Sequence, residues 1–213
     1  MNLTEMVPPS CRLFVIPARD APTAIILRRG PSRWYHTILW DMQRDTFTEG
    51  AWFRGRIYEE KCDLSPDGRL FVYFAFKGIR LGETIMDSWT AISRPPWLRA
   101  LVIWPQGTTY GGGGRFVGNR RLAPRSIIDL DQPYPGHPPG LELAPVVGEP
   151  EPHRSTGEVP GSDWCGHDHQ GQVIYTLGGE LFRCLRTGDV RVADFSNRHP
   201  NPEAPPEWAS RWP

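Results

Sequence analysis

The feature that most constrains this chain is a tight turn followed at once by an unbroken apolar run. The turn reads Ser-Pro-Asp-Gly at residues 65–68, and the run occupies residues 70–76. Pro66 presets the φ angle of the turn, and Gly68 can adopt positive φ without steric cost. The run is rich in β-forming residues and too short for a typical helix. The pattern therefore predicts a tight turn that leads into a buried β-strand.

Similar short segments recur along the chain and predict a mainly β, antiparallel fold. Strand-like runs separated by turn residues occupy residues 11–17, 23–28, 34–40, 89–93 and 189–195. Residues 172–176 and 180–184 flank Gly178-Gly179, which is typical of a β-hairpin. We expect a loop at residues 77–86 and a helical turn running into a strand at residues 97–104.

One predicted strand carries a period-two pattern. Trp34, His36, Ile38 and Trp40 alternate with other residues, so they share one face of a strand. This alternation favours a half-buried antiparallel strand, with His36 as a histidine of the core or its rim.

We interpret residues 1–213 as a single β-rich domain with two atypical segments. Residues 124–161 are dense in Pro and Gly and have little periodicity, which indicates a long surface excursion with one short strand at residues 141–143. Loops of this length are partly disordered or functional. Residues 196–213 form a Pro-rich tail that contains Trp208 and Trp212. Two tryptophans in such a tail predict that it docks, either on this fold or on a partner.

Charge and cysteine content restrict the function classes. The chain has 24 basic and 24 acidic residues and a formal net charge of zero, which lowers the expectation for nucleic acid or an anionic membrane. The net charge does not describe how charges are distributed over the surface, so the chain can still present a local basic face. No window approaches 18 apolar residues and the N-terminus lacks a signal-peptide pattern. The four scattered cysteines then predict free thiols and a cytoplasmic protein.

A weak internal repeat restricts the β architectures to be expected. Residues 67–73 and 169–175 each contain a glycine turn and an apolar run that holds a tyrosine. The turn and run resemble the inner hairpin of WD40- and TolB-type β-propeller blades. This resemblance implies a small or incomplete propeller, because four clean repeats of blade length are not found. An irregular β-sandwich is the alternative.

The pattern of the whole chain resembles a family of uncharacterised bacterial β-propeller-like proteins. The segments that carry this resemblance are residues 29–32, 62–68, 93–96, 111–114 and 193–195. It implies an accessory subunit of a multi-protein bacterial system, such as a CRISPR-associated or other defence operon.

The leading functional hypothesis is a non-enzymatic protein–protein interaction module. No Gly-x-Ser-x-Gly elbow or other catalytic motif is found. Aromatic residues and arginine are enriched at protein interfaces. The candidate partner-binding residues are Trp208, Trp212, Trp34, Arg33, Trp97 and Arg99.

A second hypothesis is a zinc-binding protein or a metal-dependent enzyme. Thiolate and imidazole groups suit Zn²⁺, and the candidate ligands are Cys165, His167, His169 and Cys184. The alternative interpretation of this segment is a polar turn before a strand, capped by Asp168. No other cofactor is expected.

A third hypothesis is a single-stranded nucleic-acid binder. Arginine and aromatic residues interleave at residues 33–35, 52–54 and 97–99, and such pairs can hold phosphates and stack on bases. They can equally be arginines that cover the edges of aromatic rings. The four glycines at 111–114 can cradle a phosphate, but we favour a backbone that passes close to bulky tryptophans, where any Cβ would clash.

Overall fold

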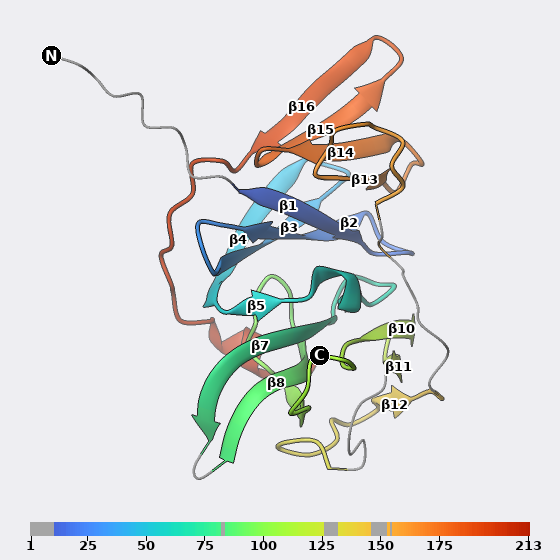
Figure 1. The fold of residues 1–213 in the computed structure, drawn as a ribbon. Coiled ribbons are helices and arrows are strands. Elements are labelled where there is room, and N and C mark those ends of the chain that lie inside the picture. The colour runs from blue at the N-terminus through green and yellow to red at the C-terminus, as the bar shows by residue number, and fades with distance from the viewer. Residues whose placement is uncertain (1–10, 82–83, 126–131, 146–152, 154) are drawn as a thin grey trace, which may run out of the picture.

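The computed structural model describes residues 11–81, 84–125, 132–145, 153 and 155–213, and it confirms a mainly β chain (Figure 1). Sheet A is an antiparallel meander of four strands. Sheet B contains five strands, of which β5 and β6 both pair with β7. Sheet A comprises β1 (Arg12–Pro17), β2 (Thr23–Arg29), β3 (Trp34–Asp41) and β4 (Thr46–Arg54). Sheet B comprises β5 (Arg56–Ile57), β6 (Asp63–Leu64), β7 (Phe71–Leu81), β8 (Thr84–Ser93) and β9 (Val102–Pro105).

Two further sheets follow along the chain. In sheet C, β10 pairs antiparallel with β11, and β11 pairs parallel with β12. Sheet D is a second antiparallel meander of four strands. Sheet C comprises β10 (Gly114–Gly118), β11 (Arg121–Pro124) and β12 (Glu142–Leu143); sheet D comprises β13 (Trp164–His167), β14 (Val173–Leu177), β15 (Glu180–Leu185) and β16 (Gly188–Asp194). Two short 3₁₀ helices lie at Glu59–Lys61 and Glu207–Ser210.

The turn before β7 forms as its sequence predicts. Gly68 has a φ of 74° and donates its N–H to the carbonyl oxygen of Ser65 at 2.8 Å. The Oγ of Ser65 also accepts the backbone N–H of Leu70 at 2.9 Å. Because the turn satisfies its own polar groups, the apolar run can enter the core immediately.

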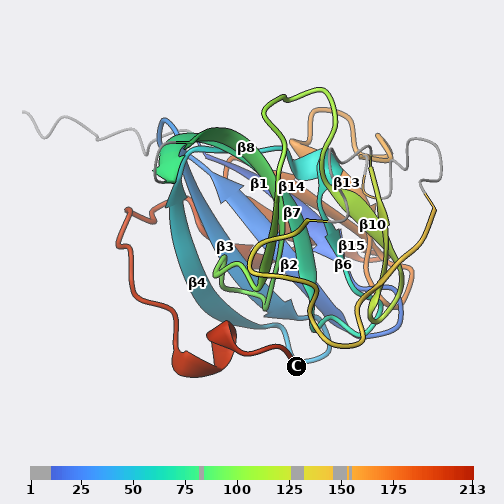
Figure 2. The same ribbon diagram turned by 90° about the horizontal axis from the view of Figure 1, so that it is seen from below.

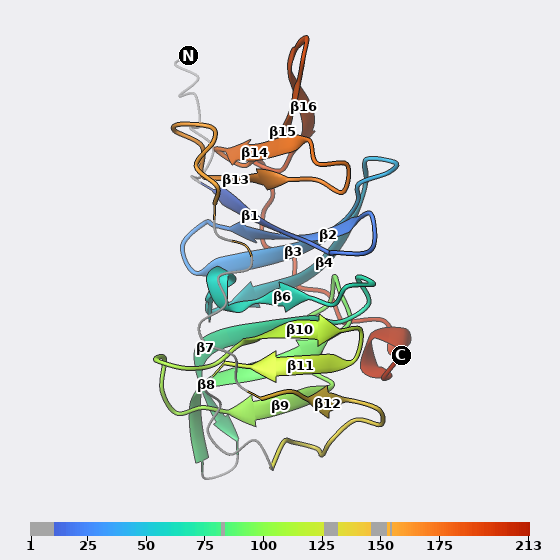
Figure 3. The ribbon, with the colours of Figure 1, turned by 90° about the vertical axis from the view of Figure 1, so that its right-hand side faces the viewer.

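The four sheets stack face to face in the order D, A, B, C (Figures 1 and 3). Three apolar clusters hold the layers together. Ile26 and Trp40 of sheet A pack with Leu181 of sheet D. The opposite face of sheet A, which includes Leu27, packs against sheet B, and the far face of sheet B packs against Phe116 of sheet C. Sheets A and B are therefore buried on both faces.

This layering corrects several sequence expectations. Residues 34–40 were expected to be half-buried, but β3 is buried along most of its length because sheets D and B cover its two faces. His36 is 1% exposed, which confirms a core position. The loop expected at residues 77–86 is wrong, because β7 and β8 continue through most of it with a bulge between Phe76 and Ile79.

The expected helical turn at the start of residues 97–104 is also wrong. Residues 97–100 have no regular structure, and only the strand is confirmed, as β9. The stack has more layers than a two-layer β-sandwich. A closed propeller ring is not confirmed, since sheets D and C lie at opposite ends of the stack (Figure 3).

The two atypical segments connect distant layers. Of the segment 124–161, residues 126–131, 146–152 and 154 lie outside the described residues, and its predicted short strand is confirmed as β12 of sheet C. The tail after β16 runs down the side of the stack, outside β4 (Figures 1 and 2). Arg198 forms an ion pair there with Glu49 of β4 at 2.8 Å. In the described part of the chain, no helix is long and apolar enough to cross a membrane.

The glycines at residues 111–114 allow close backbone approach. A Cβ on Gly112 would lie 2.3 Å from the ring of Phe74, and one on Gly113 would lie 2.0 Å from the carbonyl oxygen of Lys61. The predicted close approach is confirmed, but the nearest neighbours are Phe74 and the Lys61 backbone, not the tryptophans expected from the sequence. The missing Cβ atoms allow the chain leading into sheet C to approach sheet B closely.

Candidate functional site: a basic pocket between sheets A and B

The turn between β2 and β3 and the bend between β4 and β5 lie side by side. The N–H of Gly55 in the bend donates to the carbonyl oxygen of Arg33 in the turn at 2.9 Å. A Cβ on Gly55 would lie 2.9 Å from the carbonyl oxygen of Phe76, so only glycine fits without displacement. The pairing of Trp34 with Arg54 then brings arginines from both segments to one rim.

These segments enclose a pocket of about 820 Å³, which we call the basic pocket. Such a volume is in the range of ligand sites in proteins. Five of its lining residues are cationic and none is acidic. The pocket is lined by Arg29, Ser32, Arg33, Tyr35, Arg54, Gly55, Arg56, Phe76 and Lys77.

The charges of the basic pocket are weakly compensated. Arg56 lies 3.6 Å from a carboxylate oxygen of Glu59, just outside the lining. Among the described residues, no carboxylate forms an ion pair with Arg29, Arg33 or Arg54. Lys77 lies 5.7 Å from the centre of the Phe53 ring, a contact that leaves its charge in place. The pocket therefore presents concentrated positive charge although the whole chain is neutral.

Tyr35 and Phe76 give the pocket its aromatic walls. The Tyr35 hydroxyl donates to Glu59 at 2.9 Å, and burial, followed by the Glu59 charge, raises the pKa of Tyr35 far above its ordinary value. Tyr35 is thus a neutral wall residue. Phe76 is 40% exposed although it is a large apolar side chain. Its ring is available to a ligand.

A neighbouring cavity of about 450 Å³ shares Arg29 and Arg56 with the basic pocket. It also holds three carboxylates. Arg12 lies 3.4 Å from Asp163, and the Lys61 ammonium donates to the carbonyl oxygen of Thr109 at 2.7 Å. The neighbouring cavity is therefore closer to charge balance than the basic pocket.

One of the predicted partner-binding residues, Arg33, lies at the basic pocket, and its neighbour Trp34 does not. Trp34 points to the other face of β3, where it is half-buried and meets Trp52 edge-on with ring centres 6.3 Å apart.

Arg99 lies beside the tail, which carries two more of the predicted partner-binding residues, Trp208 and Trp212. Arg99 and Trp212 line a third cavity of about 670 Å³, together with residues 134–139 of the excursion. Trp212 packs against the cluster between sheets B and C, and its buried Nε1 has no hydrogen-bond partner among the described residues. Trp97 is half-buried in a turn.

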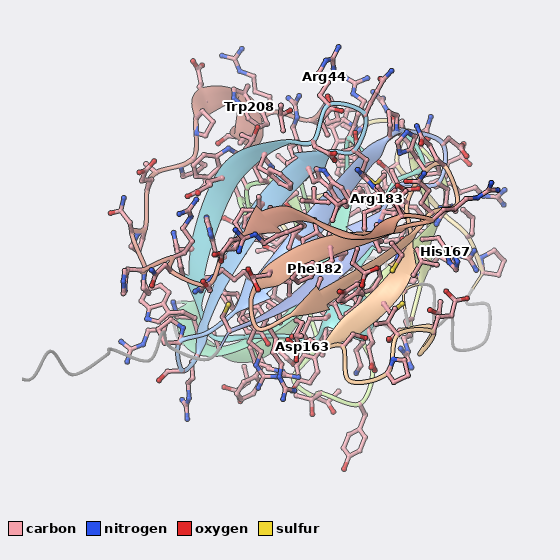
Figure 4. All side chains as sticks on the ribbon, turned by 90° about the horizontal axis from the view of Figure 1, so that it is seen from above. Arg44, Asp163, His167, Phe182, Arg183 and Trp208 are labelled. Atoms are coloured by element: carbon pink, nitrogen blue, oxygen red, sulfur yellow. The ribbon has the colours of Figure 1, made fainter. Side chains whose placement is uncertain are left out.

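Trp208 lies further out than Trp212. It is 42% exposed and sits under the guanidinium of Arg94, which is 4.9 Å from the ring centre (Figure 4). Arg94 also donates to the Trp208 carbonyl oxygen at 2.9 Å. The tail thus docks on this fold, which was one of the two outcomes expected for it.

The predicted zinc ligands do not converge. Cys165 is buried and accepts a hydrogen bond from Thr156 at 3.4 Å. His167 is exposed at the sheet edge and pairs with Glu158 at 3.3 Å (Figure 4). Burial, and then a hydrogen bond with Asp189, raises the pKa of Cys184, which disfavours the thiolate that a metal needs. In the described residues, no three His, Cys, Asp or Glu side chains form a metal-binding group.

The alternative interpretation of the same segment is confirmed. His169 is exposed in the turn after β13. Asp168 caps that turn by accepting the backbone N–H groups of Gln170 and Gln172 at 2.9 and 3.0 Å. A zinc site at these residues stays a prediction, which metal analysis of the purified protein tests.

A buried polar cluster escaped the sequence analysis. The fully buried Asp63 carboxylate accepts the Phe116 N–H at 2.7 Å and lies 3.3 Å from Arg19 and 2.7 Å from Nε2 of His153. Trp164 of sheet D donates its indole N–H to the His153 carbonyl oxygen at 3.0 Å. The cluster connects all four sheets. Asp63, which precedes the tight turn, is the one member of the cluster that the sequence pattern included.

Most of the basic pocket also escaped prediction. The chain has only two lysines, and Lys77 lines the basic pocket while Lys61 lines the neighbouring cavity. The rarity of lysine was the sequence signal that pointed to these two cavities.

The chain was compared with protein-family models, curated proteins and solved structures, and none of them matches it.

Proposed function

We propose that this protein is a non-enzymatic binding module that holds an anionic partner in the basic pocket. The observation that carries the proposal is five cations and no carboxylate around one cavity of about 820 Å³. Like charges brought together repel one another, and a bound anion relieves that repulsion. Most of the cations are arginines, whose planar forks match carboxylate and phosphate groups.

The lining supports binding rather than catalysis. Its described residues include no His, Cys, Asp or Glu, and among them no hydrogen bond joins the Ser32 hydroxyl to the Lys77 ammonium, so the lining shows no nucleophile already paired with a base. The hydroxyl of Tyr35 is neutral and is already bonded to Glu59. The pocket supplies charge, shape and an aromatic surface.

Retention on a heparin matrix tests this function. We expect the protein to bind at low ionic strength despite its zero net charge, and the double variant Arg33→Glu/Arg54→Glu to pass through. The control Arg115→Glu/Arg186→Glu makes the same charge change at exposed arginines outside the basic pocket and should still bind. Failure of the wild type to bind, or equal elution of the two double variants, would overturn the proposal.

We also propose that the stack is an incomplete propeller, as the blade-like turn predicts. The support is that β13, β1, β6 and β10, one strand from each sheet, contact one another in turn. The innermost strands of propeller blades are arranged in this way around their axis.

The biological setting is proposed from the sequence. All four cysteines are free thiols, which fits a reducing cytoplasm. An accessory role in a bacterial multi-protein system, such as a defence operon, stays a prediction from the resemblance. Co-purification with the products of neighbouring genes tests it.

A further inference from the structure

The cations of the basic pocket continue as a path. Arg29 and Arg56 stand between the basic pocket and the neighbouring cavity, and they line both. Beyond them lie Lys61 and Arg12, of which Arg12 is paired with Asp163, and on the other side lie Arg33 and Arg54, the least compensated part of the path. A path of cations suits a ligand that carries one negative charge per repeating unit.

An open aromatic ring lies directly beside this path. Phe76 and Arg56 are cross-strand partners in the pairing of β5 with β7. Cross-strand neighbours have Cβ atoms about 5 Å apart, and both of these side chains line the basic pocket. A ligand that offers a flat ring next to an anionic group would satisfy both. A nucleotide has this combination, since its base stacks on aromatic rings and its phosphate binds arginine.

The concave shape of the basic pocket favours single-stranded over double-stranded nucleic acid. The basic pocket is a cavity between two sheets, and its aromatic wall belongs to the lining. A base can reach that wall only if it is free of a pairing partner, because paired bases are stacked inside the duplex.

We infer that the partner is single-stranded nucleic acid, whose phosphates bind the arginines of the basic pocket while one base stacks on Phe76. This inference rests on the proposed function and names its ligand class. It also places the ligand in the pocket formed by two of the interleaved segments, residues 33–35 and 52–54.

Fluorescence anisotropy with labelled oligothymidylate and oligouridylate of about 12 nucleotides tests the inference. Engagement of five cations predicts that the logarithm of affinity falls against the logarithm of salt with a slope of about −3.5. Arg54→Ala should reduce that slope by about 0.7, whereas Arg186→Ala, outside the pocket, should leave it unchanged.

The base contact has its own variant. Phe76→Ala should weaken binding by about 5- to 100-fold and leave the salt slope unchanged, since it removes stacking and no charge. Tyr110→Ala is the matched control, because Tyr110 is 96% exposed and lines neither cavity. Circular dichroism of each variant verifies that it is folded.

The possible results separate the two proposals. If a labelled oligoglutamate peptide binds at the basic pocket and the oligonucleotides do not, the inference is overturned and the proposed function stands. If neither probe binds at low salt, both are overturned. Equal affinity for a duplex of the same length, or full binding by Phe76→Ala, would also refute the inference.

Discussion

Replacement of Asp63 by alanine should destabilise the protein more than any surface charge change. The side chain of Asp63 is completely buried, and it binds Arg19, His153 and the backbone N–H of Phe116. An ionised carboxylate only accepts hydrogen bonds, so the three neighbours act as donors toward it. Alanine leaves the Phe116 N–H and the His153 ring without this acceptor, and leaves Arg19, among the described residues, with only the carbonyl oxygen of Phe116.

The size of the effect follows from the burial. Removing one partner of a buried ion pair costs about 3–5 kcal/mol, and here the cost falls on the buried donors that lose their acceptor, because Arg19 is partly exposed to water. The orphaned Phe116 N–H accounts for about 1–3 kcal/mol of this cost. For a chain of this size, each kcal/mol lowers the melting temperature by about 2–4 °C, so Asp63→Ala should lower it by roughly 6–20 °C.

Urea denaturation followed by tryptophan fluorescence measures the free energy of unfolding. The control is Glu180→Ala, which removes an exposed ion pair with Arg191 at 2.6 Å and should cost no more than about 1 kcal/mol. If Asp63→Ala and Glu180→Ala lower the stability equally, the cluster does not hold the four sheets together as we argue.

Three further predictions test the packing. Burial lowers the pKa of His36 to about 4, so the unfolded chain binds a proton at this histidine before the folded chain does as the pH falls below about 6.5. The free energy of unfolding should therefore decline by up to about 3 kcal/mol between about pH 6.5 and about pH 4. In urea titrations at several pH values, His36→Phe should remove that part of the decline. Gly113→Ala should destabilise the protein more than Gly157→Ala in the same titration, because both glycines have positive φ but only Gly113 would press a Cβ onto backbone atoms; equal losses would contradict the steric reasoning. Trp212→Ala should lower the free energy of unfolding by at least about 2 kcal/mol, because this ring packs on a core cluster. Trp208→Ala should lower it by about 1 kcal/mol or less, because its exposed ring loses mainly a cation–π contact. Thermal melts that reverse this order would refute the docking of the tail.

Local features were predictable where a single segment determines them. The turn at residues 65–68 and the hairpin around Gly178 contain residues whose backbone preferences select those turns. The short strand in the excursion was also visible as an isolated apolar pair. Residues 77–86 misled the prediction, because strand pairing between β7 and β8 overrides their weak local preference.

The candidate site was predictable only in part. Arg33 and Arg54 stood out beside aromatic residues in the sequence, and the structure places both at the basic pocket. Arg29 directly precedes the turn in sequence, but no aromatic residue beside it marked it as a site residue. Phe76 and Lys77 come from β7, which meets the turn only in the folded sheets, and the rarity of lysine was the one signal for Lys77.

The sequence by itself determined the β-rich class and the positions of most strands. These properties depend on side-chain periodicity and turn chemistry, which act over a few residues. Only the tertiary structure decided the stacking order of the sheets, the docking of Trp212 and the gathering of cations around one cavity. Net charge and local pattern contain no distances between strands, so a neutral chain could conceal a strongly basic pocket.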